Sequence, residues 1–404
     1  MVKSQYDYTR GVVTGIKDPN LVLTKSDHND PYDRVTQVTA GYGLTGSNTS
    51  ITQFSYPTAS SNTTTVTRQL DDTRWLTYRD SYDGFGRAVG AAEAEDGGQA
   101  STTFTIFSSR ILDGLGRIRF ASNPSRGSGA TTNGWTRNTY DLAGRLTEVA
   151  SFSGDTQPPG SGTNASWTGS VVTTYASEVT TVRDQANKQR RSSVDGLGRL
   201  IKVDEMNEAP ATSVYATTSY GYDARGNLTS VTQGPVGNQQ TRSFSYDKLS
   251  RLTDANNPEN GHIGYSYDVA SNLTTKTDGR FTTTFVYDSL NRVNSRSYSG
   301  TPATPPVTYA YDTATNGVGR LASVTTAGVS TYTYTSYDAI GRTTAFSQAT
   351  NSQTYTMGAT YNKAGMPETQ TYPSGRVVNS IYDAAGRLST AKATKAPRTA
   401  RKKY

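Results

Sequence analysis

The chain has 404 residues, of which 33% are hydrophobic and 18% are charged, and its mean hydropathy is −0.63. So few charges exclude a highly charged disordered chain, and so few apolar residues exclude a protein built around one large compact core. The 27 tyrosines and 38 glycines, with abundant Thr and Ser, are typical of many short β-strands joined by tight turns.

The formal net charge of +7 comes from the C-terminal end of the chain. No acidic residue follows Asp383, and without six basic residues in the last part of the chain the remaining 34 basic residues nearly balance 33 acidic ones. We therefore predict a basic, disordered tail over 391–404 and no nucleic-acid binding by the rest of the chain. The six basic residues are Lys392, Lys395, Arg398, Arg401, Lys402 and Lys403.

Export signals and reactive thiols are not recognised in this sequence. It has no cysteine, so neither disulfides nor thiolate chemistry are available to it. No apolar run approaches the length of a membrane-spanning helix, and residues 1–20 lack the apolar stretch of a signal peptide. We expect no membrane span, and export would need another segment or another system.

Residues 1–70 carry weak forms of a turn motif that becomes regular further along the chain. Asp18-Pro19-Asn20 and Tyr32-Asp33-Arg34 are the degenerate turns, and a Thr/Ser-rich run follows at 58–67. We predict degenerate repeats over 1–70 and a regular repeat array over 71–390.

The array is marked by a recurring frame, Tyr-Asp-x-x-Gly-Arg. Repetition mostly at about 20 to 30 residues indicates a repeat architecture, in which each unit buries its apolar face against its neighbours. Complete copies begin at Tyr82, Tyr140, Tyr337 and Tyr382, and looser copies begin at Leu112, Val194, Tyr222, Tyr246, Tyr267, Tyr287, Tyr311 and Tyr361. We assign a structural role to Tyr82, Asp83, Gly86, Arg87, Tyr140, Asp141, Gly144, Arg145, Tyr222, Asp223, Gly226, Tyr246, Asp247, Tyr267, Asp268, Tyr287, Asp288, Tyr337, Asp338, Gly341, Arg342, Tyr382, Asp383, Gly386 and Arg387.

Each copy has the pattern of a β-hairpin. Aromatic residues two positions apart, such as Tyr220 and Tyr222, precede the Asp, so their rings share one face of a strand. The Asp can accept backbone N–H bonds, and the Gly three residues later can adopt a positive φ. In divergent copies Asn187, Asn272 and Asn291 lie at or beside this Gly position, where Asn is the next most tolerant residue.

The strand after each turn begins Arg-Leu-x-x-Val, as at Arg145, Leu146 and Val149. Leu and Val three positions apart do not share a face of a flat strand. Either a β-bulge lies between them, or their side chains lie on opposite faces of the sheet. Two strands per copy give on the order of two dozen consecutive strands, and twisted open sheets of more than about ten strands curl or split. The predicted fold is all-β, with tandem hairpins in a long curved or spiral antiparallel sheet.

These residues resemble the Rhs/YD-repeat family, which includes bacterial rearrangement-hotspot proteins, the B and C components of insecticidal Tc toxins, and animal teneurins. The resemblance covers about 71–390. It implies that the tandem YD-repeat hairpins form a β-spiral shell, which encloses a cargo toxin in bacterial members and serves adhesion in teneurins. For this chain it implies a partial shell and a secreted or cell-surface location.

The chain departs from the bacterial members at its C-terminal end. Those proteins close the repeats with a core-associated segment that contains Asp-Pro and Gly-Arg-Phe elements and aspartyl autoprotease residues, and we recognise no such ending after Arg387. The fragment Asp278-Gly279-Arg280-Phe281 lies in mid-array and leads into the next repeat. We therefore expect a fragment or truncated member, and we do not extend self-cleavage or a carried toxin to it.

No residue set predicts a catalytic, cofactor-binding or metal site. The repeat aspartates each fit a turn role, so the paired carboxylates of a glycosidase have little support. His28 and His262 have no second ligand three or four residues away. The repeat arginines, which could grip anionic cargo or sugars, are better explained by pairing with Asp or stacking on Tyr; they are Arg87, Arg117, Arg145, Arg199, Arg342 and Arg387.

The sequence thus predicts a non-enzymatic shell wall that encloses or presents a protein partner or cargo polypeptide, in toxin delivery or intercellular competition. The alternative is a cell-surface adhesion module that binds carbohydrate or protein, because tyrosine-rich walls suit stacking against sugars. An enzyme is the third and least supported hypothesis.

Overall fold

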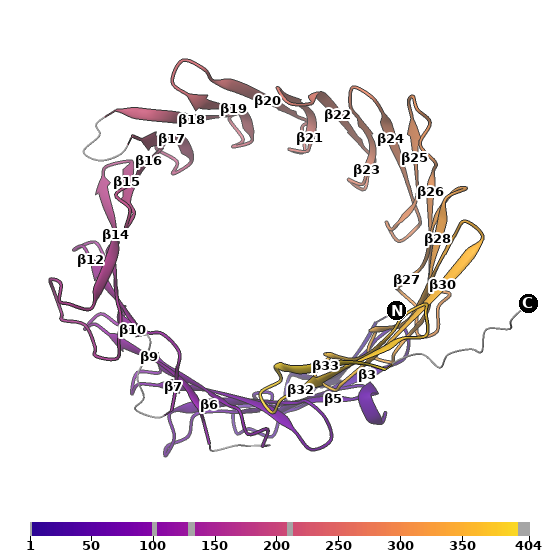
Figure 1. The fold of residues 1–404 in the computed structure, drawn as a ribbon, viewed down its shortest axis with the longest axis horizontal. Helices are drawn as coiled ribbons and strands as arrows, with labels where there is room; N and C mark the ends of the chain where they lie inside the picture. The colour runs from indigo at the N-terminus through magenta and orange to yellow at the C-terminus, as the bar shows by residue number, and fades with distance from the viewer. Residues whose placement is uncertain (1, 99–102, 128–133, 208–212, 395–404) are drawn as a thin grey trace, which may run out of the picture. The chain divides into compact units, whose positions relative to one another are not determined.

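The structure, a computed structural model, describes residues 2–98, 103–127, 134–207 and 213–394. Within these ranges the chain forms 33 β-strands, and a single 3-10 turn, η1 (Gly46–Asn48), is the one helical element. The pairings between these strands are antiparallel, and nearly all of them join strands that follow one another in the chain (Figure 1). The predicted all-β fold of tandem antiparallel hairpins is confirmed.

The strands group into two compact units. Unit 1 combines Met1–Arg110 and Pro124–Thr131 with Val307–Tyr404, and unit 2 combines Ile111–Asn123 with Thr132–Pro306. Unit 1 therefore brings together the first and last parts of the described chain.

Unit 1 contains two ladders of strands. The N-terminal ladder consists of β1 (Lys3–Asp7), β2 (Val12–Lys17), β3 (Leu23–Asp27), β4 (Gln37–Ala40), β5 (Ser50–Ser55), β6 (Thr63–Gln69), β7 (Trp75–Tyr82), β8 (Ala88–Ala94), β9 (Ile106–Leu112) and the short β11 (Ser125–Arg126), which pairs with β9. The C-terminal ladder consists of β26 (Val307–Tyr311), β27 (Leu321–Thr326), β28 (Ser330–Tyr337), β29 (Thr343–Thr350), β30 (Gln353–Tyr361), β31 (Pro367–Thr371), β32 (Val377–Tyr382) and β33 (Leu388–Thr394).

Unit 2 contains one ladder. Its strands are β10 (Ile118–Ser122), β12 (Trp135–Tyr140), β13 (Leu146–Phe152), β14 (Trp167–Ala176), β15 (Val179–Arg183), β16 (Gln189–Val194), β17 (Leu200–Met206), β18 (Val214–Tyr222), β19 (Leu228–Pro235), β20 (Gln240–Tyr246), β21 (Leu252–Asn257), β22 (Gly261–Tyr267), β23 (Leu273–Thr277), β24 (Thr282–Tyr287) and β25 (Val293–Ser299).

A β-bulge follows each repeat turn and decides between the two alternatives for the Leu-x-x-Val pattern. Tyr222 pairs with Leu228 and Tyr220 pairs with Val231, because Thr229 is an extra residue in the second strand. The bulge therefore places Leu and Val on the same face as both tyrosines. The same register shift occurs at Tyr82, Tyr140, Val194, Tyr246, Tyr267, Tyr287, Tyr311, Tyr361 and Tyr382.

In the repeat turns that have no insertion, the third residue after the turn aspartate has a left-handed backbone. Gly86 has φ +75° and Gly144 has φ +80°. Asn291 takes this position in one divergent copy with φ +60°, while Ser271 takes it in another with φ +68°. Asn272 therefore replaces the arginine of the frame, and the glycine position beside it belongs to Ser271.

The sheet has little buried interior. Among the described residues, only Leu70, Thr77 and Asp204 combine a large side chain with less than 2% exposure. Most repeat tyrosines are half-buried, because each covers the neighbouring hairpin on one side only. Stability must therefore come from contacts between successive hairpins, as in other linear repeat arrays.

The two ends of the chain contain regular strands where the structure describes them. Six strands, β1 to β6, lie within residues 1–70. β33 extends to Thr394, and residues 395–404 of the expected basic tail lie outside the described residues.

Two glycines of one turn give a matched test of the backbone requirement. Neither Gly84 nor Gly86 has an atom within 4 Å of an added Cβ, but only Gly86 has a positive φ. Since a left-handed backbone costs an L-residue about 1–2 kcal/mol, Gly86→Ala should speed hydrogen exchange in the β7–β8 turn by about 5- to 30-fold. Gly84→Ala should leave exchange unchanged or slower. Equal effects of the two variants would contradict the assigned turn geometry.

Candidate functional site

Each repeat turn is closed by its aspartate. The Asp83 carboxylate accepts the backbone N–H groups of Phe85 at 2.9 Å and Arg87 at 3.0 Å, and Arg87 Nε donates to its second oxygen at 2.7 Å. The Gly86 N–H donates to the Asp83 carbonyl at 3.0 Å. One carboxylate thus binds two backbone donors and one guanidinium. The same three side-chain contacts occur at Asp113, Asp195, Asp247, Asp288 and Asp383.

These hydrogen bonds favour the ionised carboxylate. The guanidinium of Arg87, with the backbone N–H groups of Arg87 and Phe85, lowers the pKa of Asp83. In a turn of the same kind near the N-terminus, the Arg34 guanidinium lowers the pKa of Asp30 to about 2. A carboxylate that is ionised and fully engaged in this way has no proton to donate at neutral pH.

The arginine also contacts the next hairpin. The guanidinium carbon of Arg199 lies 4.9 Å from the centroid of the Tyr222 ring, and Arg199 Nη1 donates to the Asp223 carbonyl at 3.3 Å. Such contacts between a cation and an aromatic ring stabilise exposed sites by about 0.5–1 kcal/mol. Equivalent pairs are Arg117 with Tyr140, Arg145 with Tyr175, Arg251 with Tyr267, Arg320 with Tyr337 and Arg342 with Tyr361.

The hydroxyl of the repeat tyrosine completes this link. Tyr222 donates to the Leu200 carbonyl at 2.8 Å, at the bulge of the preceding hairpin. The repeat arginine precedes this carbonyl directly, so one tyrosine contacts both the side chain and the backbone of its neighbour. The hydroxyls of Tyr140, Tyr175, Tyr267, Tyr287, Tyr337, Tyr361 and Tyr382 make the equivalent bond.

Divergent copies keep the turn but change its partners. Asn227 replaces the arginine and donates to the second Asp223 oxygen at 2.8 Å, and Asn272 does the same to Asp268 at 2.9 Å. The four-residue insertion after Tyr311 is closed by the Gly319 N–H, which donates to Asp312 at 2.6 Å. In these copies the aspartate still accepts the hydrogen bonds that close the turn, although the partner that Arg87 provides at Asp83 has changed.

A buried aspartate outside the repeat motif was not predicted. Asp204 in β17 is 2% exposed and accepts Arg191 Nη2 at 2.8 Å, Thr217 Oγ1 at 2.8 Å and Lys202 Nζ at 3.1 Å. Burial raises its pKa, but these hydrogen bonds outweigh burial, so the pKa is lowered overall. Asp204 is thus an ionised carboxylate whose hydrogen bonds connect strands β16, β17 and β18. Because it occurs once, the repeat pattern gave no signal for it.

The two ladders of unit 1 meet along a line that the sequence did not reveal. Successive connections in an antiparallel ladder alternate between its two edges. We call the edge that carries the turn at Asp83 and its equivalents at every second connection the turn edge. The other is the loop edge, and it also carries the degenerate turns at Asp18 and Asp184. In unit 1 the loop edge of the N-terminal ladder lies against the turn edge of the C-terminal ladder, and we call this contact the seam.

Polar groups join the seam at successive turns. The Asn20 side chain exchanges two hydrogen bonds with the Val318 backbone, at 2.8 and 3.1 Å, and Arg342 Nη2 donates to the Ser47 carbonyl at 2.7 Å. Further pairs are Arg68 Nη2 with the Ala364 carbonyl at 2.7 Å, Arg74 Nη1 with the Tyr382 carbonyl at 2.7 Å, and the ion pair of Arg387 with Glu95.

Small apolar residues at the turn tips are covered by this contact. Ala364 and Ala385, each two residues after the first residue of its turn, are 8% and 7% exposed. A Cβ added to Gly41 would lie 3.4 Å from Ile340 Cγ2, which places that tip directly against the loop edge. The seam thus buries turn tips that would otherwise face solvent.

Each histidine contacts backbone carbonyls or a single carboxylate. The two ring nitrogens of His28 contact the carbonyls of Asp33 at 2.7 Å and Val13 at 3.1 Å, and exposed His262 contacts Asp254 at 3.0 Å. The described residues contain no group of three or more His, Cys, Asp or Glu side chains that could hold a metal ion. They also contain no helix that is long and apolar enough to span a membrane.

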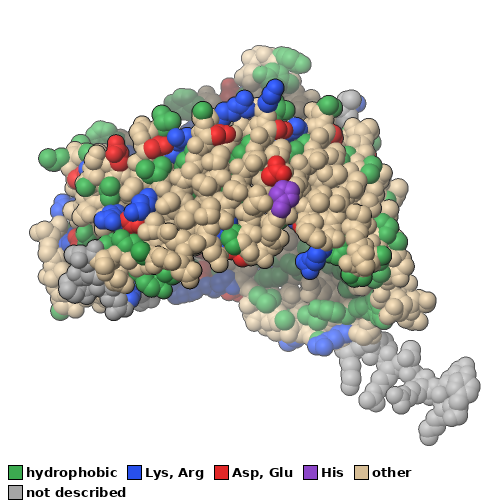
Figure 2. All heavy atoms as spheres, turned by 90° about the horizontal axis from the view of Figure 1, so that it is seen from above, with side chains coloured by type: hydrophobic (Ala, Val, Ile, Leu, Met, Phe, Trp, Pro, Cys, Tyr) green, Lys and Arg blue, Asp and Glu red, His purple; other side chains and the backbone are tan. Residues whose placement is uncertain are grey.

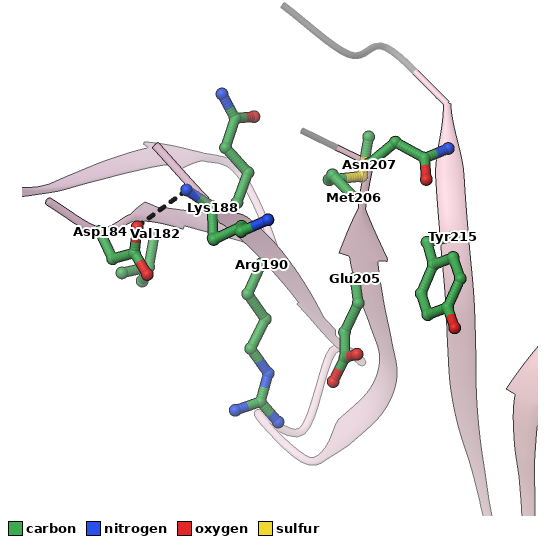
Figure 3. A pocket seen from close by; sticks show the side chains of 9 residues that line it. Val182, Asp184, Lys188, Arg190, Glu205, Met206, Asn207 and Tyr215 are labelled. Carbon is green, nitrogen blue, oxygen red and sulfur yellow. Dashed lines mark hydrogen bonds between the residues drawn. The ribbon is translucent and has the colours of Figure 1, made fainter. Parts of the chain in front are cut away.

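Unit 2 has a cavity of about 520 Å³ between the β15–β16 turn and strands β17 and β18 (Figure 3). Arg190 and Glu205 are directly opposed across two strands, and the Tyr215 ring, 58% exposed, flanks them. Opposed charges beside an exposed ring can bind a polar ligand. The other lining residues are Val182, Asp184, Lys188, Gln189, Met206 and Asn207.

No family model and no curated protein matches the chain. Solved Tc toxin structures do match it. The crystal structure of TcdB2–TccC3 superposes with a TM-score of 0.71 at 13% identity, over 98% of this chain and 25% of that chain. TcdB2–TccC3 without its hypervariable C-terminal region gives 0.75 at 12%, over 97% and 26%. A Photorhabdus luminescens Tc holotoxin pore gives 0.69 at 12%, over 97% and 27%.

The chain has the fold of these Tc toxin structures. The predicted resemblance is confirmed at the level of the fold, and the chain spans about a quarter of the length of the solved chains that it matches. The identity of 12–13% carries no single residue from those proteins to this one. The roles of the repeat residues rest on the contacts described above.

The lowered pKa of the turn aspartates predicts a pH dependence. A folded-state pKa below the unfolded value of about 3.9 adds stability that is present above that value and is lost as the pH falls through the folded pKa. Hydrogen-exchange protection of the Arg87 amide, corrected for the intrinsic rate, should therefore fall below about pH 4.

The turn at Asn362 is a built-in control for this experiment. Asn362 Oδ1 accepts the Met366 N–H at 2.9 Å, in the place of the aspartate, and its amide does not titrate in this range. The Met366 amide should keep its protection at the pH where the Arg87 amide loses it. Parallel loss at both amides would show that the turn carboxylates do not control the acid response.

Proposed function

We propose that the chain is a non-catalytic wall segment of a shell of the Rhs/YD-repeat type, and that the wall encloses or presents another polypeptide. The observation that carries this proposal is the superposition of 97–98% of the chain on Tc toxin structures, of which it covers about a quarter. A segment that matches part of a larger assembly over its whole length fits a wall element better than a self-contained enzyme.

The chemistry of the repeat residues supports a scaffold. Asp195 binds its own turn, Arg199 reaches the next hairpin, and Tyr222 reaches back to the bulge. The recurring charged and aromatic groups are thus engaged in holding neighbours together, which leaves few of them to act on a substrate. Toxin delivery or intercellular competition is the setting that we propose for this wall, with secretion or surface display.

Carbohydrate or protein adhesion is the second candidate, and one observation favours it. The cavity beside Tyr215 offers an exposed ring next to opposed charges, an arrangement that suits a sugar. Saturable binding on a glycan array that is lost in Tyr215→Ala, with an unchanged circular dichroism spectrum, would favour this candidate over the shell.

Protease protection tests the shell directly. The natural gene product should be purified under native conditions with the proteins encoded beside it, then digested and analysed by mass spectrometry. We expect a polypeptide that is not part of the wall to survive digestion at neutral pH. The same polypeptide should be digested when the sample is first held at a pH below the lowered pKa of the turn aspartates, because the turn carboxylates then lose their charge. A sample in which no such polypeptide is protected would contradict the proposal.

A further inference from the structure

The tips of the repeat turns differ between the two units. In unit 1 the tips of the C-terminal ladder carry Ile340, Ala364 and Ala385, and the seam covers them. In unit 2 five of the corresponding tips carry large apolar side chains that are between 68% and 110% exposed. They are Leu142, Leu197, Leu249, Val269 and Leu290.

The last three of these residues form one uninterrupted row, while the tips at Ser177-Glu178 and Ala224-Arg225 separate Leu142 and Leu197 from each other and from that row. All five lie one or two positions after the turn aspartates of the hairpins β12–β13, β16–β17, β20–β21, β22–β23 and β24–β25, all on the turn edge of unit 2. Consecutive turns are two strand spacings apart, about 9–10 Å, so neighbouring tips such as Leu249, Val269 and Leu290 make a continuous apolar ridge. Figure 2 shows hydrophobic side chains among acidic and basic ones along one edge of the face in view. An exposed apolar row marks an interaction surface.

The seam shows what such a turn edge binds in this protein. It receives a loop edge, whose arginines donate to the backbone carbonyls of the turns, as Arg74 does to Tyr382. Arg74 is presented by a loop in which Asp71 Oδ1 accepts the N–H groups of Thr73 at 2.9 Å and Arg74 at 2.7 Å. This loop joins one hairpin to the next, from β6 to β7.

Unit 2 carries a second loop of this construction on its own loop edge. Between β23 and β24, Asp278 Oδ1 accepts the N–H groups of Arg280 at 2.9 Å and Phe281 at 3.0 Å. The exposed Arg280 takes the position of Thr73, one residue before the position of Arg74. Unit 2 therefore has both halves of a seam, a turn edge with an apolar row and a loop edge with a presented arginine.

We propose that the turn edge of unit 2 binds the loop edge of unit 2 in a second copy of this chain. The interface is heterologous, since different edges meet, and it leaves one free edge of each kind on the outer copies. Association therefore continues beyond a dimer as the protein concentration rises. The inference goes beyond the proposed function, because it needs no enclosed polypeptide.

Sedimentation velocity over a wide concentration range tests this interface. The unchanged chain should form larger species as concentration rises, and the triple variant Leu197→Asp, Leu249→Asp, Leu290→Asp should remain monomeric. The matched control is Val286→Asp, because Val286 is 49% exposed but lies within strand β24 and not at a turn tip. Circular dichroism should confirm that each variant is folded.

Mixing separates this arrangement from other modes of association. Arg280→Glu disables the loop edge and the triple variant disables the turn edge, so a mixture of the two retains one good interface and should stop at a heterodimer. A wild-type chain that stays monomeric overturns the proposal. A folded triple variant that still associates also overturns it. The same holds for a Val286→Asp variant that remains monomeric, and for a mixture that forms no heterodimer.

Discussion

The constraint on which this wall depends is that every hairpin must be tied to the next, because no hairpin has a core of its own. The tie begins at an ionised aspartate. Asp195 fixes the turn and holds Arg199, and Arg199 then lies against Tyr222 of the following hairpin. Tyr222 returns a hydrogen bond to the bulge that follows Arg199. Turn geometry, ion pair and cross-hairpin contact are therefore one continuous network that recurs along the chain.

This network explains why a chain with so little buried apolar surface can have regular structure. Nearest-neighbour contacts of modest strength add up along a repeat array, and each hairpin gains from both of its neighbours. Because these contacts run only between neighbouring hairpins, both edges of a ladder stay available for contact with another ladder. Unit 1 contains such a contact between ladders, since Arg68 and Arg74 of one ladder donate hydrogen bonds to the Ala364 and Tyr382 carbonyls of the other.

The parts of this structure that were predictable from the sequence are the parts that repeat. The Tyr-Asp-x-x-Gly-Arg frame indicated the hairpins, the turn aspartates and the left-handed glycine, because each has a local physical cause. The bulge at Thr229 was left open, since a Leu-x-x-Val spacing fits two geometries and only the pairing register decides between them. Asp204 and the seam at Asn20 were missed, because each depends on a partner that is unique or remote in sequence. Function was predictable only as far as the fold, because the repeated side chains serve the wall.

A double-mutant cycle on Arg145 and Tyr175 tests the central claim most directly. These residues lie on successive hairpins, with the guanidinium carbon 4.3 Å from the ring centroid and the Tyr175 hydroxyl 2.9 Å from the Leu146 carbonyl. Local opening free energies from hydrogen exchange of β13 and β14 should be measured for Arg145→Gln, Tyr175→Leu and the double variant. We predict a coupling free energy of about 0.5–1 kcal/mol between the two residues. Additive effects of the two substitutions would contradict the claim that arginine and tyrosine bind successive hairpins together.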